Sequence, residues 1–394
     1  MSNLIQANAI NTPLRSDLYH NIIGSPPYWG GVRQYSGNQH SGFPEMSFSP
    51  WPGLDPITVP SMGAQYGHES GEMAYVAHSV LILRELKRVL RPDGVLWWII
   101  GDSLVGNGQL AGIPGMVMKA AQADGWIVRN ELVWSKHNAP PEPLHHFRYE
   151  QTPCDCKRRK QDAAINEEVV RLGVQNNILG PGRHKAGLNT RHKNPEFREV
   201  DPDCPMCHGL GGVGEYKLKR GSWRHTRQHE TVLMMVKKMG YYADYEAAKE
   251  KADTEPWRNP RSVLNINKSS YRGAHFAAFP PELVGTLLKT TAPVKVCAEC
   301  GSPWARVFEY VGGGDKQWRS WRPTCDCDTD APPVPGLVLD PFVGSGTTGV
   351  VCKEMGLRFA GLDLSYSYLA EQARWNIDRK AAPVDLSDLP IFGG

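Results

Sequence analysis

Residues Ser25-Pro-Pro-Tyr28 combine a hydroxyl, two rigid residues and an aromatic ring directly after a short apolar segment. Pro26 and Pro27 hold the backbone extended and remove two N–H donors, so the nearby carbonyls point in a fixed direction. The amino nitrogen of cytosine or adenine is a poor nucleophile because its lone pair is delocalised into the ring. If the Ser25 hydroxyl and the Pro26 carbonyl accept the amino hydrogens, the lone pair turns toward an electrophile while Tyr28 stacks on the extruded base. A Pro-Pro turn that merely ends a strand is the alternative.

A glycine-rich turn lies near the other end of the chain, in Asp340-Pro-Phe-Val-Gly-Ser-Gly-Thr-Thr348. Gly344, Gly346 and Gly349 have the spacing of nucleotide-binding turns, in which the backbone approaches a ligand before a helix begins. Asp363 ends the next expected strand and is placed to accept hydrogen bonds from ribose hydroxyls. The pattern predicts a nucleoside cofactor and leaves open an NAD site or a tight strand-to-helix turn.

Eight of the nine cysteines form four close pairs, a pattern that favours metal over disulfides in a reducing compartment. Cys297 and Cys300 are separated by 24 residues from Cys325 and Cys327, a spacing compatible with a zinc ribbon. A second candidate zinc set has 47 residues between its pairs and consists of Cys154, Cys156, Cys204 and Cys207. Small buried thiols are the alternative for both sets.

Alternating apolar segments surround these motifs and predict an α/β fold with a parallel sheet covered on both faces. The expected strands are 21–24, 95–100, 126–134, 231–236, 337–340 and 358–362. The expected helices are 72–90, 113–123, 281–289, 347–355 and one from 365 onward, with Arg91-Pro-Asp-Gly94 ending the first. Such a sheet brings the ends of its strands, and therefore both motifs, to one edge.

Charge is distributed unevenly along the chain. The net charge is +3, but residues 144–238 hold 18 Lys and Arg against 11 Asp and Glu, which leaves −4 for the remainder. This basic segment is where we expect contact with a polyanion, a solvated basic surface being the alternative.

The longest uninterrupted apolar stretch is Val95–Ile100, and the N-terminus lacks a secretory signal, so we expect no membrane partner and a cytoplasmic location.

Together, these motifs resemble the β-group of DNA amino-methyltransferases of restriction-modification systems and phages, in which the catalytic motif precedes the cofactor motif. Further similar segments are Tyr75–Ser103, Ala123–Lys136, Arg258–Val263 and Ala274–Pro280. The resemblance covers roughly residues 1 to 143 and 226 to 394, apart from 297 to 327.

The resemblance implies a Rossmann-like S-adenosylmethionine-dependent methyltransferase, circularly permuted and carrying zinc-ribbon-like inserts. Its C-terminal strand should then lie beside the strand that leads to Ser25. The catalytic residues implied are Ser25, Pro26, Pro27 and Tyr28. The cofactor residues implied are Asp340, Pro341, Phe342, Gly344, Ser345, Gly346, Thr347, Asp363, His275, Phe279 and Pro280, with Phe342 near the sulfonium.

The same resemblance divides the chain into five parts. These are a catalytic half (1–143), a target-recognition and zinc-binding insert (144–225), a return to the methyltransferase domain (226–296), a zinc-ribbon insert (297–327) and a cofactor half (328–394). Within the family, Ser before Pro-Pro-Tyr marks cytosine-N4 enzymes, whereas Asp or Asn there marks adenine-N6 enzymes.

We therefore expect a site-specific enzyme that methylates N4 of cytosine in double-stranded DNA, in a bacterial or phage-infected cell. A cognate restriction endonuclease is a further expected partner. The alternatives are an adenine-N6 enzyme, an NAD-dependent oxidoreductase that uses the glycine turn, and a zinc-ribbon DNA-binding protein without activity.

Overall fold

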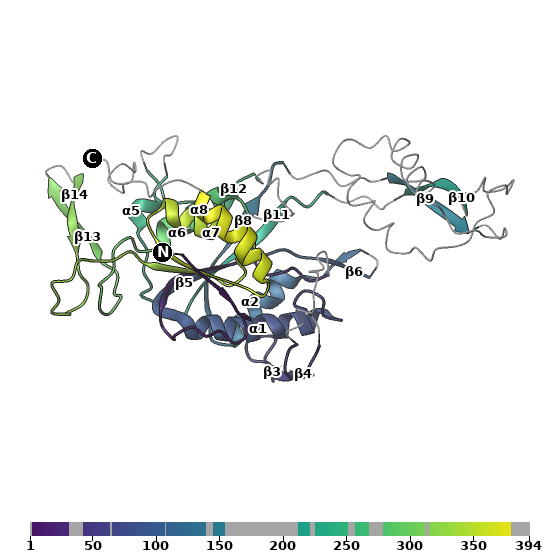
Figure 1. Cartoon of the computed structure of the whole chain (residues 1–394), viewed down its shortest axis with the longest axis horizontal. Helices are drawn as coiled ribbons and strands as arrows, with labels where there is room; N and C mark the ends of the chain where they lie inside the picture. Colours follow the sequence, from purple (N-terminus) through teal and green to yellow (C-terminus); the bar gives the residue numbers. More distant parts are fainter. Residues whose placement is uncertain are drawn as a thin grey trace. The chain divides into compact units, whose positions relative to one another are not determined.

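The structure is a computed structural model of the 394-residue chain. It describes residues 2–30, 42–63, 65–106, 108–138, 225–250, 257–267, 279–311 and 315–379, and the backbone of 145–153 and 212–220. By its contacts the chain divides into two compact units, Met1–Ala139 with Arg227–Gly394, and Pro140–Thr226. The smaller unit contains an antiparallel pair, β9 (His145–Pro153) and β10 (Gly212–Arg220) (Figure 1).

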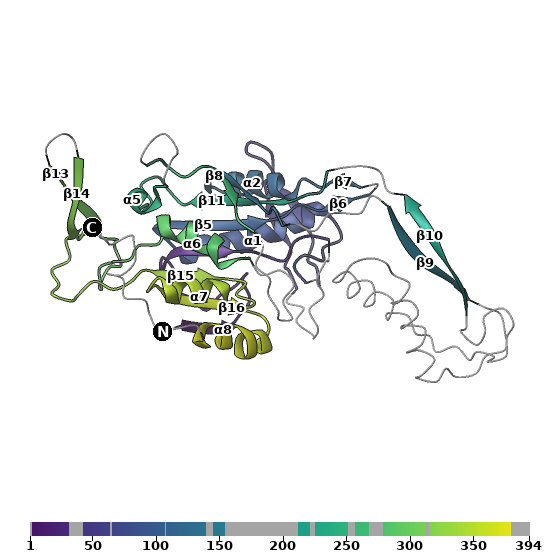
Figure 2. The same ribbon diagram turned by 90° about the horizontal axis from the view of Figure 1, so that it is seen from above.

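The larger unit is built on one eight-stranded sheet (Figure 2). The strands, in their order across the sheet, are β1 (Ser2–Gln6), β16 (Arg358–Asp363), β15 (Leu337–Asp340), β2 (Tyr19–Gly24), β5 (Leu90–Ile100), β11 (His229–Val236), β8 (Ile127–Ser135) and β12 (Val263–Asn265). The C-terminal strand β15 pairs in parallel with the N-terminal strand β2, with Val338 opposite Asn21. The glycine turn after β15 and the Ser25 turn after β2 therefore leave the same edge of the sheet.

The sheet is mixed, so the prediction of a parallel sheet is wrong in one respect. The pairs from β1 to β5 are parallel, as is β12 with β8, but β11 runs antiparallel to both β5 and β8. An apolar run such as Thr231–Val236 is compatible with a buried strand of either direction, so its sequence does not reveal the reversal. As a result, the start of β11 lies at the carboxyl edge, with Thr231 opposite Ile100.

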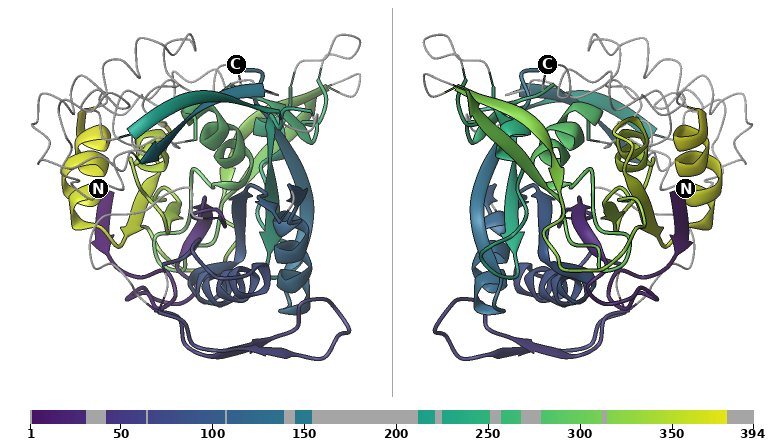
Figure 3. Two further views of the ribbon diagram at one scale, coloured as in Figure 1. Left: turned by 90° about the vertical axis from the view of Figure 1, so that its right-hand side faces the viewer. Right: turned by 90° about the vertical axis from the view of Figure 1, so that its left-hand side faces the viewer.

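Helices cover both faces of the sheet (Figure 3). They are α1 (Glu72–Val89), α2 (Ile113–Ala123), α6 (Pro281–Thr291), α7 (Thr347–Glu354), the π-helical segment η1 (Tyr368–Ala373) and α8 (Arg374–Arg379). Along β5, Leu96, Trp98 and Ile100 belong to the core cluster that contains α1 and α2 residues. The alternate residues Val95, Trp97 and Ile99 belong to the cluster that contains α6 and α7 residues. Because successive side chains of a strand point to opposite faces, β5 contributes residues to the cores on both faces of the sheet.

Most expected elements are confirmed, but one boundary is wrong. Helix α2 has the predicted bounds, while α1 ends at Val89 and Leu90 already begins β5. Arg91-Pro-Asp-Gly94 is therefore part of the strand and not a separate turn. Strand β5 pairs with β2 at Leu90 and again from Val95 onward. The register shift between Tyr19 and Asn21 leaves Arg91-Pro-Asp-Gly94 without a partner on β2, so these turn-forming residues interrupt the pairing without ending the strand.

Several small elements complete the described structure. They are the paired strands β3 (Met46–Phe48) and β4 (Ile57–Val59), β6 (Leu104–Val105) and β7 (Gln109–Leu110), β13 (Ala305–Val311) and β14 (Asp315–Arg322), and the short helix α5 (Tyr245–Ala248). Among the described residues, no helix is both long enough and apolar enough to span a membrane.

Candidate active site

Ser25 directly follows β2, whose six residues are all buried. Ser25 itself is half-buried and Pro26 is buried, so the motif lies at the edge of the core. Gly24 allows the close packing behind it, because a Cβ there would lie 2.8 Å from the Trp98 ring and 3.6 Å from Pro341 Cγ. Gly24, directly before the Ser25 motif, thus lies close to Pro341 at the start of the glycine turn.

The glycine turn is shaped by two residues in the left-handed region, Gly344 (φ 46°) and Gly346 (φ 81°). Gly346 is the N-cap of α7, and a Cβ there would also lie 2.9 Å from Ala373 Cα. Any side chain at this position would therefore meet both backbone strain and a steric clash. Ser345 is buried, and the half-buried Thr347 begins α7.

Asp340 holds the turn together from inside. Its carboxyl group is fully buried and accepts hydrogen bonds from the Phe342 N–H (2.9 Å) and the Thr348 hydroxyl (2.6 Å). Burial, and to a lesser degree the charge of Asp363, raises the pKa of Asp340 to about 7. These contacts indicate that Asp340 positions the loop, because the side chain presents no exposed surface to a ligand.

Asp363 ends β16, next to the glycine turn. Its Oδ2 atom accepts a hydrogen bond from the Gly344 N–H (3.1 Å), and Oδ1 accepts one from the Ser365 N–H (2.9 Å). The residue is half-buried, and burial raises its pKa. A carboxylate offers about four lone-pair positions, so these two bonds orient Asp363 while leaving acceptor capacity for ligand hydroxyls.

Aromatic residues connect the two motifs. Phe342 stacks with Tyr66 at a ring-centroid distance of 6.3 Å, and Tyr66 stacks with Tyr75 at 4.8 Å. The Tyr75 hydroxyl donates a hydrogen bond to the Pro27 carbonyl (3.0 Å), and Tyr75 is fully buried. Phe342 also makes an edge contact with Trp98 at 5.9 Å. The glycine turn and the Ser25 motif are thus connected through packed rings and not only through the sheet.

Tyr28 is fixed at both ends of its side chain. Its hydroxyl donates a hydrogen bond to Glu230 Oε2 (2.6 Å), and Glu230 Oε1 is paired with the Lys136 ammonium. Its ring lies against Gly101, where a Cβ would be 2.6 Å from the ring edge. Burial and the Glu230 charge raise the pKa of Tyr28 well above its ordinary value, so the phenol keeps its proton.

The model of the DNA methylase (N6_N4_Mtase) family matches residues 19–374 of this chain. The chain belongs to the DNA methylase family. The Type II methyltransferase M.Cfr9I of Citrobacter freundii is 26% identical to this chain, over 88% of this chain and 78% of the relative. The Type II methyltransferase M.SmaI of Serratia marcescens is 25% identical, over 90% of this chain and 83% of the relative. A solved structure titled PvuII DNA methyltransferase (cytosine-N4-specific) aligns over 94% of this chain and 84% of its own, with 13% identity and a TM-score of 0.48.

Membership of the family makes the chain an S-adenosylmethionine-dependent DNA methyltransferase. Of its expected site residues, Ser25 to Tyr28, Asp340 to Thr347 and Asp363 lie together at the carboxyl edge of the sheet. Phe279 belongs to the same core cluster as Val343, and Pro280 is the N-cap of α6. His275 lies outside the described residues.

Four residues around the expected site were not predicted: Tyr66, Tyr75, Lys136 and Glu230. Lys136 directly follows β8, and Glu230 is the second residue of β11, so a charge beside each apolar run was the available signal. Tyr75 occupies an apolar helix position, where its hydroxyl gives no sign of a contact with Pro27.

The cysteines of the later set come together in the methyltransferase. The sulfur atoms of Cys297, Cys300, Cys325 and Cys327 all lie within 4.8 Å of one another. The first pair forms a tight loop in which the Gly301 N–H donates to the Cys297 carbonyl (3.0 Å). Zinc bound by four thiolates has Zn–S distances of about 2.3 Å and sulfur separations of about 3.8 Å, so the residues fit this metal.

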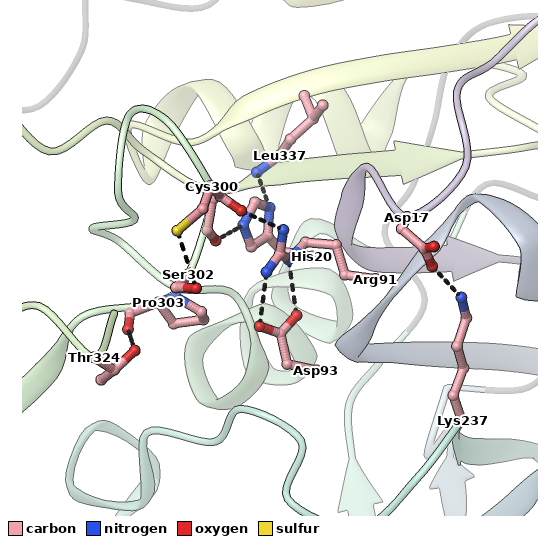
Figure 4. Close-up of polar contacts among 11 residues, drawn as sticks. Asp17, His20, Arg91, Asp93, Lys237, Cys300, Ser302, Pro303, Thr324 and Leu337 are labelled. Carbon is pink, nitrogen blue, oxygen red and sulfur yellow. Dashed lines mark hydrogen bonds and ion pairs between the residues drawn. The ribbon is translucent and has the colours of Figure 1, made fainter. Parts of the chain in front are cut away.

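The loop Cys297–Cys300 is attached to the opposite, amino edge of the sheet (Figure 4). His20 interacts with the Gly301 carbonyl at 2.8 Å through Nε2 and accepts a hydrogen bond from the Leu337 N–H (3.1 Å) through Nδ1. Arg91 donates to the Cys300 carbonyl (2.9 Å) and pairs with Asp93. This loop and the adjacent Gly301 therefore contact β2 and β5, and His20 connects them to Leu337 at the start of β15, at the opposite end of the strands from Ser25.

The remaining cysteines divide into two cases. Cys154, Cys156, Cys204 and Cys207 lie outside the described residues, so a second zinc set remains a prediction. Cys352, on α7, is fully buried in the core cluster of that face, which indicates a packing role.

Proposed function

We propose that this protein is a site-specific methyltransferase that transfers a methyl group from S-adenosylmethionine to N4 of cytosine in double-stranded DNA, after the base leaves the helix. The observation that carries the proposal is the half-buried Ser25 at the end of β2, packed beside the glycine turn. In the family that the sequence resembles, Ser at this position accompanies cytosine-N4 activity. Adenine-N6 methylation, which needs the same mechanism, is the second candidate.

Several observations support a cofactor at the glycine turn. The left-handed Gly344 and Gly346 expose the backbone before α7, and Asp363 is oriented by two backbone N–H groups. We assign Asp363 to the ribose hydroxyls and Phe342 to the neighbourhood of the sulfonium, whose charge is favourable near a ring face. Asp340 and Thr348 keep the turn in shape. The parallel pairing of the C-terminal strand β15 with the N-terminal strand β2 supports our proposal that the domain is Rossmann-like and circularly permuted.

The chemical role of the chain is alignment. Bound S-adenosylmethionine supplies an electrophilic methyl group, so no covalent enzyme intermediate is needed. Ser25 and the Pro26 carbonyl accept the amino hydrogens and direct the nitrogen lone pair to that methyl group. As the N–C bond forms, the electron pair of the broken C–S bond stays on sulfur, and the methylated nitrogen releases one proton to water. Tyr28 provides a ring for the extruded base.

We assign a structural zinc ion to Cys297, Cys300, Cys325 and Cys327, whose sulfurs are grouped tightly enough for tetrahedral coordination.

The basic insert, 144–225, is proposed to contact DNA phosphates and base edges. A cognate restriction endonuclease in the same bacterial or phage-infected cytoplasm is proposed because similar proteins are named Type II methyltransferases.

The test is the identity of the methylated nucleoside. Unmethylated duplex DNA is incubated with the protein and S-adenosylmethionine, digested, and examined by mass spectrometry. We expect N4-methylcytosine. N6-methyladenine would select the second candidate, and unmodified DNA would refute methyl transfer by this chain.

A further inference from the structure

Glu69 and His78 form a polar pair in the protein interior. Nδ1 of His78 lies 2.9 Å from Glu69 Oε1, and neither side chain has exposed surface. The His78 ring also stacks on Phe43, with the ring centroids 3.7 Å apart. Among the described residues, Nε2 of His78 has no hydrogen-bond partner. Because a buried polar atom without a partner costs stability, packing alone is a weak reason for a histidine at this position.

The Glu69–His78 pair shapes the segment 66–69, which has no regular secondary structure. The second carboxyl oxygen of Glu69, Oε2, accepts a hydrogen bond from the Gly67 N–H (2.9 Å). An ionised carboxylate only accepts, so Nδ1 of His78 donates to the other oxygen. His78 belongs to α1. The helix therefore holds Glu69, and Glu69 in turn holds the backbone of Gly67.

This segment bonds to the chain directly after the Ser25 motif. The Gly67 carbonyl accepts a hydrogen bond from the Gly30 N–H (3.2 Å). The Glu69 carbonyl accepts one from the indole N–H of Trp29 (3.0 Å). Both residues whose backbone carbonyls hold the chain at this point are thus fixed by the Glu69 carboxyl group or belong to Glu69 itself.

Gly67 also makes a close steric contact with the motif. Its backbone is left-handed (φ 93°), and a Cβ there would lie 3.0 Å from the Tyr28 carbonyl oxygen and 3.2 Å from Pro27 Cβ. Pro26 and Pro27 have no N–H group, so the motif cannot be held by backbone donors at these two positions. The Pro26 carbonyl belongs to the peptide unit that ends at Pro27. A contact that fixes Pro27 therefore also limits the direction of this carbonyl.

We propose that the Glu69–His78 pair is a positioning device for the catalytic motif. Through Gly67, it fixes the backbone from Pro27 to Gly30, and with it the Pro26 carbonyl that accepts an amino hydrogen of the target base. This inference rests on the proposed function, since it assigns the pair to the alignment of the amine. Neither side chain touches the substrate, so the pair should affect the rate of transfer and not cofactor binding.

The test compares two substitutions of His78 in single-turnover methyl transfer, with unmethylated bacterial chromosomal DNA and saturating labelled S-adenosylmethionine. His78→Leu removes the donor to Glu69 and should lower the rate per cofactor-binding molecule roughly 10- to 100-fold, as small misplacements of reacting groups do. The cofactor dissociation constant should change less than about threefold. In His78→Asn, Nδ2 is attached to Cγ as Nδ1 of histidine is and can donate to Glu69. This variant should stay within about threefold of the wild-type rate.

A second variant, Gly67→Ala, tests the same contact without changing the polar pair, and it serves if His78→Leu does not fold. The added Cβ must displace the Tyr28 carbonyl or Gly67 itself, so the rate should fall about tenfold or more. The matched control is Gly53→Ala, because Gly53 is also left-handed (φ 84°) but a Cβ there would meet nothing within 4 Å. It carries the same kind of backbone strain and should transfer methyl within about twofold of the wild-type rate.

Three results would overturn the inference. They are a wild-type rate in folded His78→Leu, a wild-type rate in Gly67→Ala, and equal rate losses in His78→Leu and His78→Asn. A purely structural pair would lower the melting temperature of the His78 variants and leave the rate per cofactor-binding molecule unchanged. Absence of methyl transfer by the wild-type protein would instead refute the proposed function.

Discussion

The two carboxylates at the cofactor edge differ in their surroundings and therefore in their roles. Asp340 is fully buried, and the turn itself supplies the donors to both of its oxygens. Asp363 is half-buried and accepts two backbone N–H bonds, which orient it without using all of its lone pairs. We therefore expect substitution of Asp340 to affect folding first and substitution of Asp363 to affect ligand binding first.

The raised pKa of Asp340 predicts a pH-dependent stability. Its pKa is 3.8 in the unfolded reference and about 7 in the folded protein, so the folded state binds the proton more tightly. The destabilising effect of its charge is absent below about pH 4 and fully present above about pH 7. Compared with Asp340→Asn, the wild-type protein without ligands should lose melting temperature as pH rises through this window. A difference between the two proteins that stays constant from about pH 4.5 to 7.5 would contradict this assignment.

Removal of the Asp363 carboxylate should weaken cofactor binding. Asp363→Ala deletes the proposed ribose acceptor, and a buried hydrogen bond to a charged group corresponds to about 1 to 3 kcal/mol of binding free energy. Titration calorimetry with S-adenosylmethionine measures the loss, with the exposed Asp378→Ala on α8 as the matched control. Unchanged affinity in a folded Asp363→Ala protein would show that the cofactor lies elsewhere.

At the scale of elements, the loop Cys297–Cys300 holds the first residues of neighbouring strands together at the amino edge of the sheet. His20 on β2, Arg91 on β5 and the segment before β15 all contact it or its neighbours. The cysteines are far from the catalytic motif in the topology, since they lie at the amino edge of the sheet. We therefore expect this element to support folding and not the reaction.

Cys297→Ser should remove one zinc ion per chain and lower the melting temperature, because metal binding is coupled to local folding. The residual methyl transfer per folded molecule should be close to that of wild type. Elemental analysis of reduced protein measures the metal, and Cys352→Ala, a buried thiol on α7, should keep its zinc. If wild-type protein purified under reducing conditions contains no zinc, the metal assignment is wrong.

Elements with strong local patterns could be predicted, and those defined by distant partners could not. Helix α2 and strand β15 have their predicted bounds, because apolar spacing and glycine stops specify them locally. The edge strand β1 was missed because it is short and pairs only with β16, more than 350 residues away in the sequence. The direction of β11 depends on β5 and β8 rather than on its own residues.

At the scale of the whole molecule, the catalytic edge is assembled from both ends of the chain. Parallel pairing of β15 with β2 places the glycine turn beside Ser25, and Gly24 allows Pro341 to approach. Both motifs could be predicted from the sequence, because the restricted backbone of proline and the free backbone of glycine indicate specific local conformations. The contact of Tyr28 with Glu230 spans 202 residues and depends on the antiparallel return of β11, so no local pattern indicates it.

The central claim is that Ser25 aligns the target amine for methyl transfer, and one measurement tests it directly. Rapid-quench transfer of labelled methyl to unmethylated duplex DNA, under saturating cofactor, compares wild type with Ser25→Ala. The account predicts that the variant binds cofactor and DNA normally but forms N4-methylcytosine roughly 10- to 1000-fold more slowly, as other preorganised polar groups do when removed. Transfer at the wild-type rate by Ser25→Ala would show that this hydroxyl is not an acceptor and would remove the physical basis for choosing cytosine.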